Sequence, residues 1–269
     1  MKHTVFLAAT CVRLRMLLGA ALLPLAGCQS HTQAEAAAIA AAIQQQEDGK
    51  FTSDFQTVLY RNSLAANALG LQGAVDMQMT VDSQNNVVGC SARSSRYEQR
   101  IANGQDDLRI GRLITDICWN ALFPEVRPEV FVDSKDTQTI IAPVVFVSLM
   151  GLSDKQKEHQ KSNIEMYKQI HFFREYLMTK QDIDSVGVAT LHFVSTAEGL
   201  VRECLVNLDP SAYRPKKFKI DNALQQRLST QCKHLNFQQM PGFNPNKDGL
   251  FQGYVSVEYS PWMNRQKKP

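Results

Sequence analysis

The sequence predicts an α+β protein built from two tandem α-β-β-α-β units. Each unit is expected to hold a small antiparallel sheet, helices on one face of it, and one disulfide. Two observations support this: segments of strand and helix periodicity alternate in the same order twice, and the cysteines repeat. Cys90 and Cys118 are 28 residues apart, as are Cys204 and Cys232, and an offset of 114 residues aligns both pairs without a gap.

The first unit begins with a helical stretch over 51–70, followed by a strand over 73–82. Apolar residues alternate along that strand, as expected when one face is buried: Val75, Met77, Met79 and Val81. A turn at 83–86 leads to a second strand over 87–95. The first sheet therefore starts as a hairpin.

A helix over 106–123 follows, and a final strand over 139–147 closes the unit. Its apolar residues fall on one helical stripe, which should face the sheet: Leu108, Ile114, Ile117, Cys118 and Leu122. Pro124 is expected to end the helix.

The second unit repeats this order. A helix over 155–178 precedes a hairpin of strands over 186–195 and 200–208. The next helix, over 220–237, has Asp221 or Asn222 placed to cap its start. A last strand over 250–259 completes the unit, so the same small sheet is expected twice.

The N-terminal segment has the form of an export signal. A basic start without acidic residues leads into the short apolar run 16–27, which is too short to span a bilayer comfortably. Residues 25–28, Leu-Ala-Gly-Cys, match the lipobox of bacterial lipoprotein signal peptides. That match implies lipidation of Cys28 and attachment to a membrane surface. Gln29 follows where an aspartate would signal inner-membrane retention in enteric bacteria, so the periplasmic face of the outer membrane is favoured over the inner membrane. An ordinary signal peptide with an incidental cysteine is the alternative.

Removing this segment changes the charge balance. Three of the 29 Lys and Arg residues lie in 1–27 and none of the 26 Asp and Glu residues does, so 26 of each sign remain. A neutral chain gives no reason to expect a nucleic-acid partner. We divide the sequence into the signal 1–27, an Ala-rich tether or helix 28–50, domains over 51–149 and 150–262, and a basic tail 263–269.

The four cysteines of the repeat have several possible roles, among them metal ligand, nucleophile and disulfide. Zinc sites need clustered Cys and His ligands, and a thiol nucleophile needs a histidine partner, and neither pattern recurs in both units. Even cysteines in an exported chain favour disulfides. We expect Cys90–Cys118 and Cys204–Cys232, while pairing between the units stays open. No metal and no cofactor is expected.

The unit resembles the C-terminal domain of the TonB and TolA family of envelope proteins over about 70–148 and 184–260. The likeness lies in the hairpin with Gly199 at its turn, the helix opening Ile220-Asp221, and the helix ends Leu122-Phe123-Pro124 and Leu235-Asn236-Phe237. Asn85 replaces the turn glycine in the first copy. TonB and TolA also have a transmembrane helix and a long linker, which this chain lacks, so the resemblance does not imply energy transduction.

What the resemblance does imply is a binding mode in which a sheet edge accepts an extended peptide. The closing strands, 139–148 and 250–259, are the candidate edges. Pro143 should make the first of them a poorer partner for an added strand, because proline has no backbone N–H to donate. We therefore expect the partner at the second edge, through Tyr254, Val255, Ser256 and Val257; packing of both edges against neighbouring elements is the alternative.

No enzyme motif occurs in the sequence, and three functions remain open. The first is a non-catalytic scaffold lipoprotein that binds another envelope protein in a secretion, conjugation or envelope-integrity system. The second is an interference or exclusion lipoprotein that blocks Ton- or Tol-dependent uptake of phage or colicin. The third is a hydrolase or cell-wall enzyme with an unfamiliar site.

Overall fold

The structure is a computed structural model that describes residues 29–95, 107–131, 136–147 and 151–264, with side chains from residue 38 onward. The chain separates into two compact units, Met1–Glu47 and Asp48–Pro269. The second unit holds both sheets. The boundary predicted between residues 149 and 150 remains a prediction.

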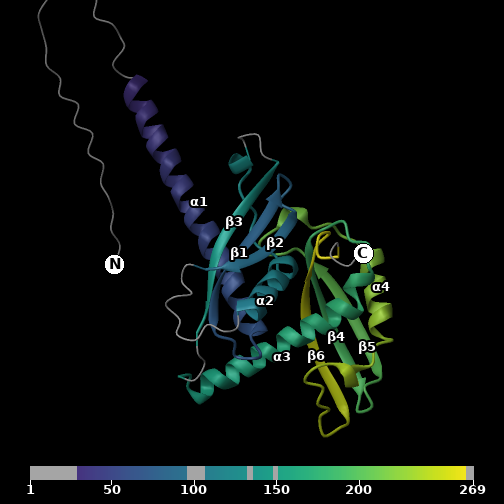
Figure 1. The fold of residues 1–269 in the computed structure, drawn as a ribbon. Coiled ribbons are helices and arrows are strands. Elements are labelled where there is room, and N and C mark those ends of the chain that lie inside the picture. Colours follow the sequence, from purple (N-terminus) through teal and green to yellow (C-terminus); the bar gives the residue numbers. More distant parts are fainter. Residues whose placement is uncertain (1–28, 96–106, 132–135, 148–150, 265–269) are drawn as a thin grey trace, which may run out of the picture. The chain divides into compact units, whose positions relative to one another are not determined.

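The fold class is confirmed: the chain is α+β, with two similar three-stranded antiparallel sheets (Figure 1). The first repeat comprises α1 (Gln29–Ala66), β1 (Gly73–Asp82), β2 (Val87–Ser94), α2 (Asp107–Asn120) and β3 (Thr137–Phe146). The second comprises α3 (Asp154–Tyr176), β4 (Gly187–Thr196), β5 (Val201–Asp209), α4 (Asn222–Cys232) and β6 (Leu250–Tyr259). Short 3-10 turns are η2 (Pro128–Phe131), η3 (Met178–Lys180), η4 (Pro215–Lys217) and η5 (Phe237–Gln239).

The two sheets share their strand order and their irregularities. The orders are β2-β1-β3 and β5-β4-β6, so the first strand of each repeat lies at the centre. The hairpin register shifts between Thr80 and Val81 in one sheet and between Val194 and Ser195 in the other. These positions are related by the same 114-residue offset as the cysteines. The duplication therefore extends to a local kink in the strands.

The hairpin turns explain why the first repeat has Asn85 where the second has a glycine. Gly199 has φ 77°, and a Cβ there would lie 2.5 Å from the backbone nitrogen of Gln238. Asn85, at the equivalent position, has φ 60°. Asparagine tolerates this left-handed conformation better than most residues. Its side chain also donates to Val126 O at 2.9 Å and accepts from Val126 N at 2.7 Å, so it anchors the turn to the chain beyond α2.

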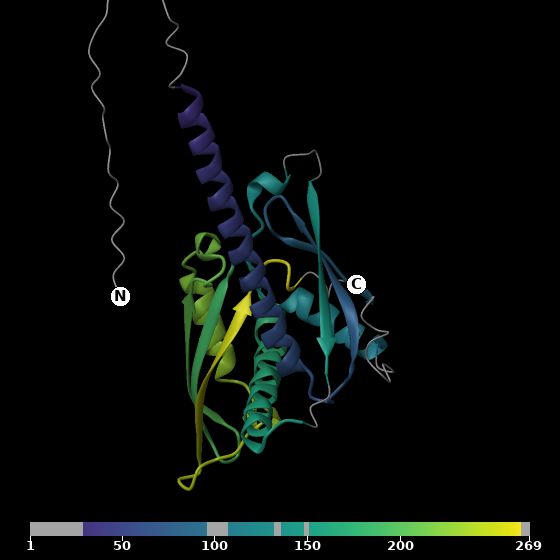
Figure 2. The same cartoon turned by 90° about the vertical axis from the view of Figure 1, so that its left-hand side faces the viewer.

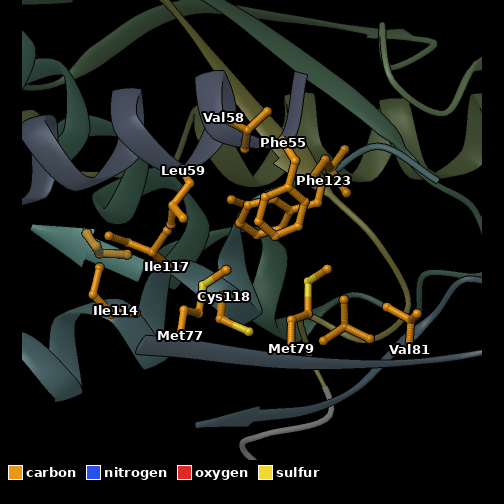
Figure 3. Close-up of a cluster of buried hydrophobic side chains, with 14 of the residues drawn as sticks. Phe55, Val58, Leu59, Met77, Met79, Val81, Ile114, Ile117, Cys118 and Phe123 are labelled. Atoms are coloured by element: carbon orange, nitrogen blue, oxygen red, sulfur yellow. The ribbon is translucent and has the colours of Figure 1, made fainter. Parts of the chain in front are cut away.

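The first core lies between the sheet and the helices α1 and α2. Figure 3 shows Phe55 of α1 stacked on Phe123, with Met77 and Met79 of β1 below them. The two ring centroids are 4.6 Å apart. The alternation predicted along β1 is confirmed, because Val75, Met77, Met79 and Val81 are all buried.

The second core is built around aromatic rings from α3, β4 and η5. Phe237 makes edge-to-face contacts with Phe173, at 5.7 Å between centroids, and with Phe193, at 4.8 Å. Such T-shaped pairs stabilise a core beyond the area they bury. Leu224 and Leu228 of α4 close the other side. Asp221 caps that helix, as predicted, by accepting from Leu224 N at 2.8 Å.

The predicted stripe on α2 is wrong at one position. Leu108 is 84% exposed, whereas Ile110 is fully buried with Ile114, Ile117 and Cys118. Leu108 is six residues before Ile114 and therefore lies on another side of the helix, whereas Ile110, four residues before it, lies on the buried stripe. The helix also ends at Asn120, ahead of Pro124, so Leu122 reaches the core from an extended segment.

The two repeats share core residues. Trp262 and Met263 follow β6 in the second repeat, yet their side chains belong to the first core. Arg214, after β5, is fully buried and lies 4.9 Å from the ring centroid of Trp262. It donates to Phe123 O at 2.7 Å and also to Asn85 O. Burial lowers the pKa of Arg214 to about 10. Residues of the second repeat thereby complete the hydrophobic core of the first.

Candidate functional site

The candidate site is the free edge of the second sheet. β6 pairs with β4 along its whole length and has no strand on its other side among the described residues. β3 occupies the same place in the first sheet, so both closing strands are edges, as expected. The order of each sheet adds two edges that were not predicted, β2 and β5, because a three-stranded sheet has an edge at either side.

The open part of β6 is its N-terminal half. Gln252, Gly253 and Tyr254 are exposed in succession, although strand residues normally alternate between exposed and buried. Gly253 pairs with Phe193, whose ring lies 3.2 Å from where a Cβ would stand. The glycine is thus exposed because it has no side chain over the core, and three consecutive residues of the edge strand are exposed.

The four residues predicted to bind a partner divide between the two faces of the sheet. Val255 and Val257 are buried in the second core, while Tyr254 is 71% exposed. Ser256 lies on the outer face, where its hydroxyl is 3.1 Å from that of Thr190. A peptide beside β6 would touch the side chains of Tyr254 and Ser256, and would meet the valines only through their backbone.

The C-terminal half of β6 is already covered. Glu258 Oε2 accepts from Leu122 N at 2.8 Å, and Glu258 O accepts from Arg174 at 3.3 Å. Arg61 of α1 lies 3.7 Å from the same carboxylate. Burial, the largest influence, raises the pKa of Glu258 above its ordinary value. Helices therefore limit any added strand to the part of β6 before this glutamate.

The outer face of the second sheet carries a row that was not predicted. His192 pairs with Leu205 on one side and with Tyr254 on the other, so the three residues lie in line across the sheet. The rings of His192 and Tyr254 are 5.9 Å apart, and Leu205 is 57% exposed. Period-two alternation in the strands was the signal that could have placed them on one face.

In the first sheet, Pro143 lies on β3 opposite Asp76. Proline is confined to edges in sheets because it cannot donate to the ladder. Its neighbours on the outer face, Ile141 and Val145, are about half exposed. That Pro143 makes β3 the poorer acceptor remains a prediction.

The disulfides are confirmed in the predicted pairing. Cys90–Cys118 joins β2 to α2, with 5.9 Å between Cα atoms, and Cys204–Cys232 joins β5 to α4, with 6.0 Å. Each bond fixes a helix to an edge strand on the far side of the sheet from the closing strand. These cysteines therefore have no thiol for catalysis or metal binding.

Among the described residues, no group of three or more His, Cys, Asp and Glu side chains is arranged to hold a metal ion. Nor does any helix in that part of the chain have the length and apolarity needed to cross a bilayer. Cys28 lies outside the described residues. Comparisons with protein-family models, with curated proteins and with solved structures found no match to the chain.

Proposed function

We propose that this protein is a non-catalytic envelope lipoprotein that binds another envelope protein by adding a peptide strand to the edge of β6. The observation that carries the proposal is the run of three exposed residues at Gln252, Gly253 and Tyr254 on an unpaired edge. An extended segment laid there would gain backbone hydrogen bonds for affinity, and the side chain of Tyr254 would contribute selectivity.

The resemblance to TonB and TolA C-terminal domains supports the same binding mode. Both repeats have the strand, hairpin and helix order of that family, and Asn85 takes the turn conformation that Gly199 takes in the second copy. The lipobox at residues 25–28 supports a lipid anchor on Cys28 that holds the protein at the periplasmic face of the outer membrane. A scaffold in a secretion, conjugation or envelope-integrity system is the role that fits these features best.

The proposal is tested by cross-linking in cells. A photoreactive benzoylphenylalanine at Tyr254 should capture the partner, and the same group at Leu205, on the opposite edge of the same sheet, should not. A second experiment changes Gln252→Lys and Tyr254→Lys, because lysines on an edge oppose strand pairing. Both residues are exposed, so the fold should survive and the partner should be lost.

Leu205→Lys is the control, since it adds a lysine to the same exposed face at the opposite edge of the sheet. Equal loss of the partner in both variants would point to binding across the face rather than to the β6 edge. The identity of the captured protein then separates the two candidate roles. Secretion or conjugation subunits support a scaffold, whereas Tol, Ton or receptor components support an interference protein.

The lipid anchor has its own test. Cys28→Ala should release the protein from membranes into the soluble periplasmic fraction, because a folded domain without its lipid has only weak affinity for the surface. Retention of the variant on membranes would contradict the anchor and leave the β6 edge unaffected.

A further inference from the structure

A cavity of about 240 Å³ lies between the two repeats, away from the open half of β6. Its wall comes from α1, α2 and α3 and from the strands β4 and β6. Six apolar residues line it, Ala65, Ile117, Ala121, Met166, Ile170 and Val188, together with polar ones that include Asn62, Asn120, Asn163, Tyr167 and Ser256. α3 runs beside the C-terminal part of α1 (Figure 2), where Gln160 Nε2 donates to Leu64 O at 2.6 Å.

Arg174 lines this cavity and is only 9% exposed. One of its terminal nitrogens donates to Glu258 O at 3.3 Å, but its Nε is buried without a hydrogen-bond partner. No carboxylate among the described residues forms an ion pair with it. Burial lowers the pKa of Arg174, which reflects the cost of holding a cation there. A buried arginine normally has its donors satisfied by a carboxylate or similar acceptor.

The carboxylate of Glu258 does not supply that acceptor. Its Oε2 accepts from Leu122 N at 2.8 Å, and its Oε1 faces Arg61 at 3.7 Å. Those contacts compensate the negative charge on the side of the cavity nearest α1 and α2. The guanidinium of Arg174 therefore has no carboxylate oxygen at ion-pair distance among the described residues, although the charges of Glu258 and Asp116 lie near enough to favour its charged form.

We propose that this cavity binds a carboxylate carried on a small branched apolar group, with the carboxylate at Arg174 and the apolar part against Ile117 and Ile170. The size fits, because a cavity of about 150 Å³ holds benzene and this one is moderately larger. Met166 and Arg61 line the cavity and are also exposed, so they mark where a ligand enters. A free carboxylic acid and the C-terminal leucine of a peptide share this chemistry.

The test uses the purified full-length protein with a ¹³C label on the methionine methyl groups. The free-acid probe is 4-methylpentanoate, compared with its neutral amide and with acetate. The peptide probe is acetyl-Ala-Ala-Leu with a free carboxyl end, compared with its C-terminal amide. We expect the acids to shift the Met166 methyl signal, and to bind at least about tenfold more tightly than the amides or acetate.

Two variants probe the two halves of the site. Arg174→Gln should weaken binding of the acid at least about tenfold and leave the amide unchanged. Ala65→Leu keeps the arginine and fills part of the cavity, so it should abolish binding of both, and it serves if Arg174→Gln does not fold. Arg202→Gln, at an exposed position on β5, is the control and should bind like the parent protein.

The two probe pairs distinguish a free acid from the C-terminus of a peptide as the source of the carboxylate. Binding of 4-methylpentanoate without the peptide supports a free acid, and binding of the peptide at least as tightly supports a chain terminus. Equal affinity for acid and amide, no shift of Met166 at millimolar acid, or unchanged binding in Ala65→Leu would each overturn the proposal. None of these results bears on the β6 edge.

Discussion

Arg214 is the residue on which the contact between the repeats depends most directly. Its guanidinium serves two backbone carbonyls, at Asn85 and Phe123, and packs against Trp262. Those carbonyls lie at the two places where the first repeat turns back on itself, the hairpin of β1 and β2 and the end of α2. The side chain of Arg214, from the second repeat, thus holds both the hairpin and the end of α2 in place.

Replacing this arginine tests its role. Arg214→Met keeps most of the side-chain volume but leaves two buried carbonyls without their donor. We expect it to lower the free energy of unfolding by about 2–4 kcal/mol, measured by urea denaturation. Arg202→Met, at an exposed site, should change it by less than about 0.5 kcal/mol. Equal effects of the two variants would mean that the buried contacts contribute nothing.

We expect His171 to make the stability depend on pH. Burial lowers its pKa, Arg174 lowers it further, and Asp116, with Oδ2 3.7 Å from Nε2, and Glu175 oppose the shift. The unfolded chain therefore binds a proton near pH 6.5 that the folded chain resists. Because the unfolded state holds more protons in that range, stability falls as the pH drops below about 6.5.

The matching experiment compares the protein with His171→Gln at about pH 7.5 and 5.5. The parent protein should lose more stability on acidification than the variant, by chemical denaturation at each pH. His159→Gln, at an exposed position of the same helix, is the control and should follow the parent protein. Parallel curves for the parent and His171→Gln would exclude this histidine as the source.

At the scale of elements, the disulfides hold each helix to its sheet. Each closes an interval of 28 residues, for which the chain-entropy model gives roughly 3–4 kcal/mol. The double variants Cys90→Ala with Cys118→Ala, and Cys204→Ala with Cys232→Ala, should each lose about that much in urea unfolding. Adding reductant to a variant should then affect only the remaining bond. A loss confined to one pair would show that the two repeats do not use their disulfides alike.

Elements with strong local signals were predictable from the sequence. The strands β1 and β6 have the predicted bounds, and the cysteine repeat gave the disulfide pairing, because alternation and spacing are local properties. The burial of Leu108 was predicted wrongly because a residue six positions before Ile114 does not share its helical face, whereas Ile110, four positions before it, does. Residues such as Arg214 and Trp262 carried no local signal, since their partners lie in the other repeat.

The candidate site also has one part that the sequence predicted and another that depends on contacts between distant residues. Tyr254 was placed on an edge by the resemblance to the TonB and TolA domains, and the structure leaves it exposed on an edge strand. The covering of Glu258 could not be foreseen, because Leu122, Arg61 and Arg174 come from three separate helices or their ends. The cavity beside it arises from the packing of the two repeats, which the sequence of either alone does not specify.

For the whole molecule, the shared core predicts a dependence of the first repeat on the second. Trp262→Ala should lower the free energy of unfolding by about 3–5 kcal/mol, as for other fully buried aromatic residues. Hydrogen exchange should show the loss of protection at β1 and α2 as well as near residue 262. Protection lost only after β6 would contradict the sharing of one core by both repeats. Tyr254→Ala, at an exposed aromatic, is the control.

The place of Trp262 in the first core also sets an order of events when the chain is made. Synthesis proceeds from the N-terminus, so β1 and α2 are made well before Trp262, which belongs to the same core. The first repeat must therefore wait, with its apolar core incompletely covered, until residue 262 has been made. A chain cut short before Trp262 would leave the first repeat incomplete, although the missing residue comes from the second.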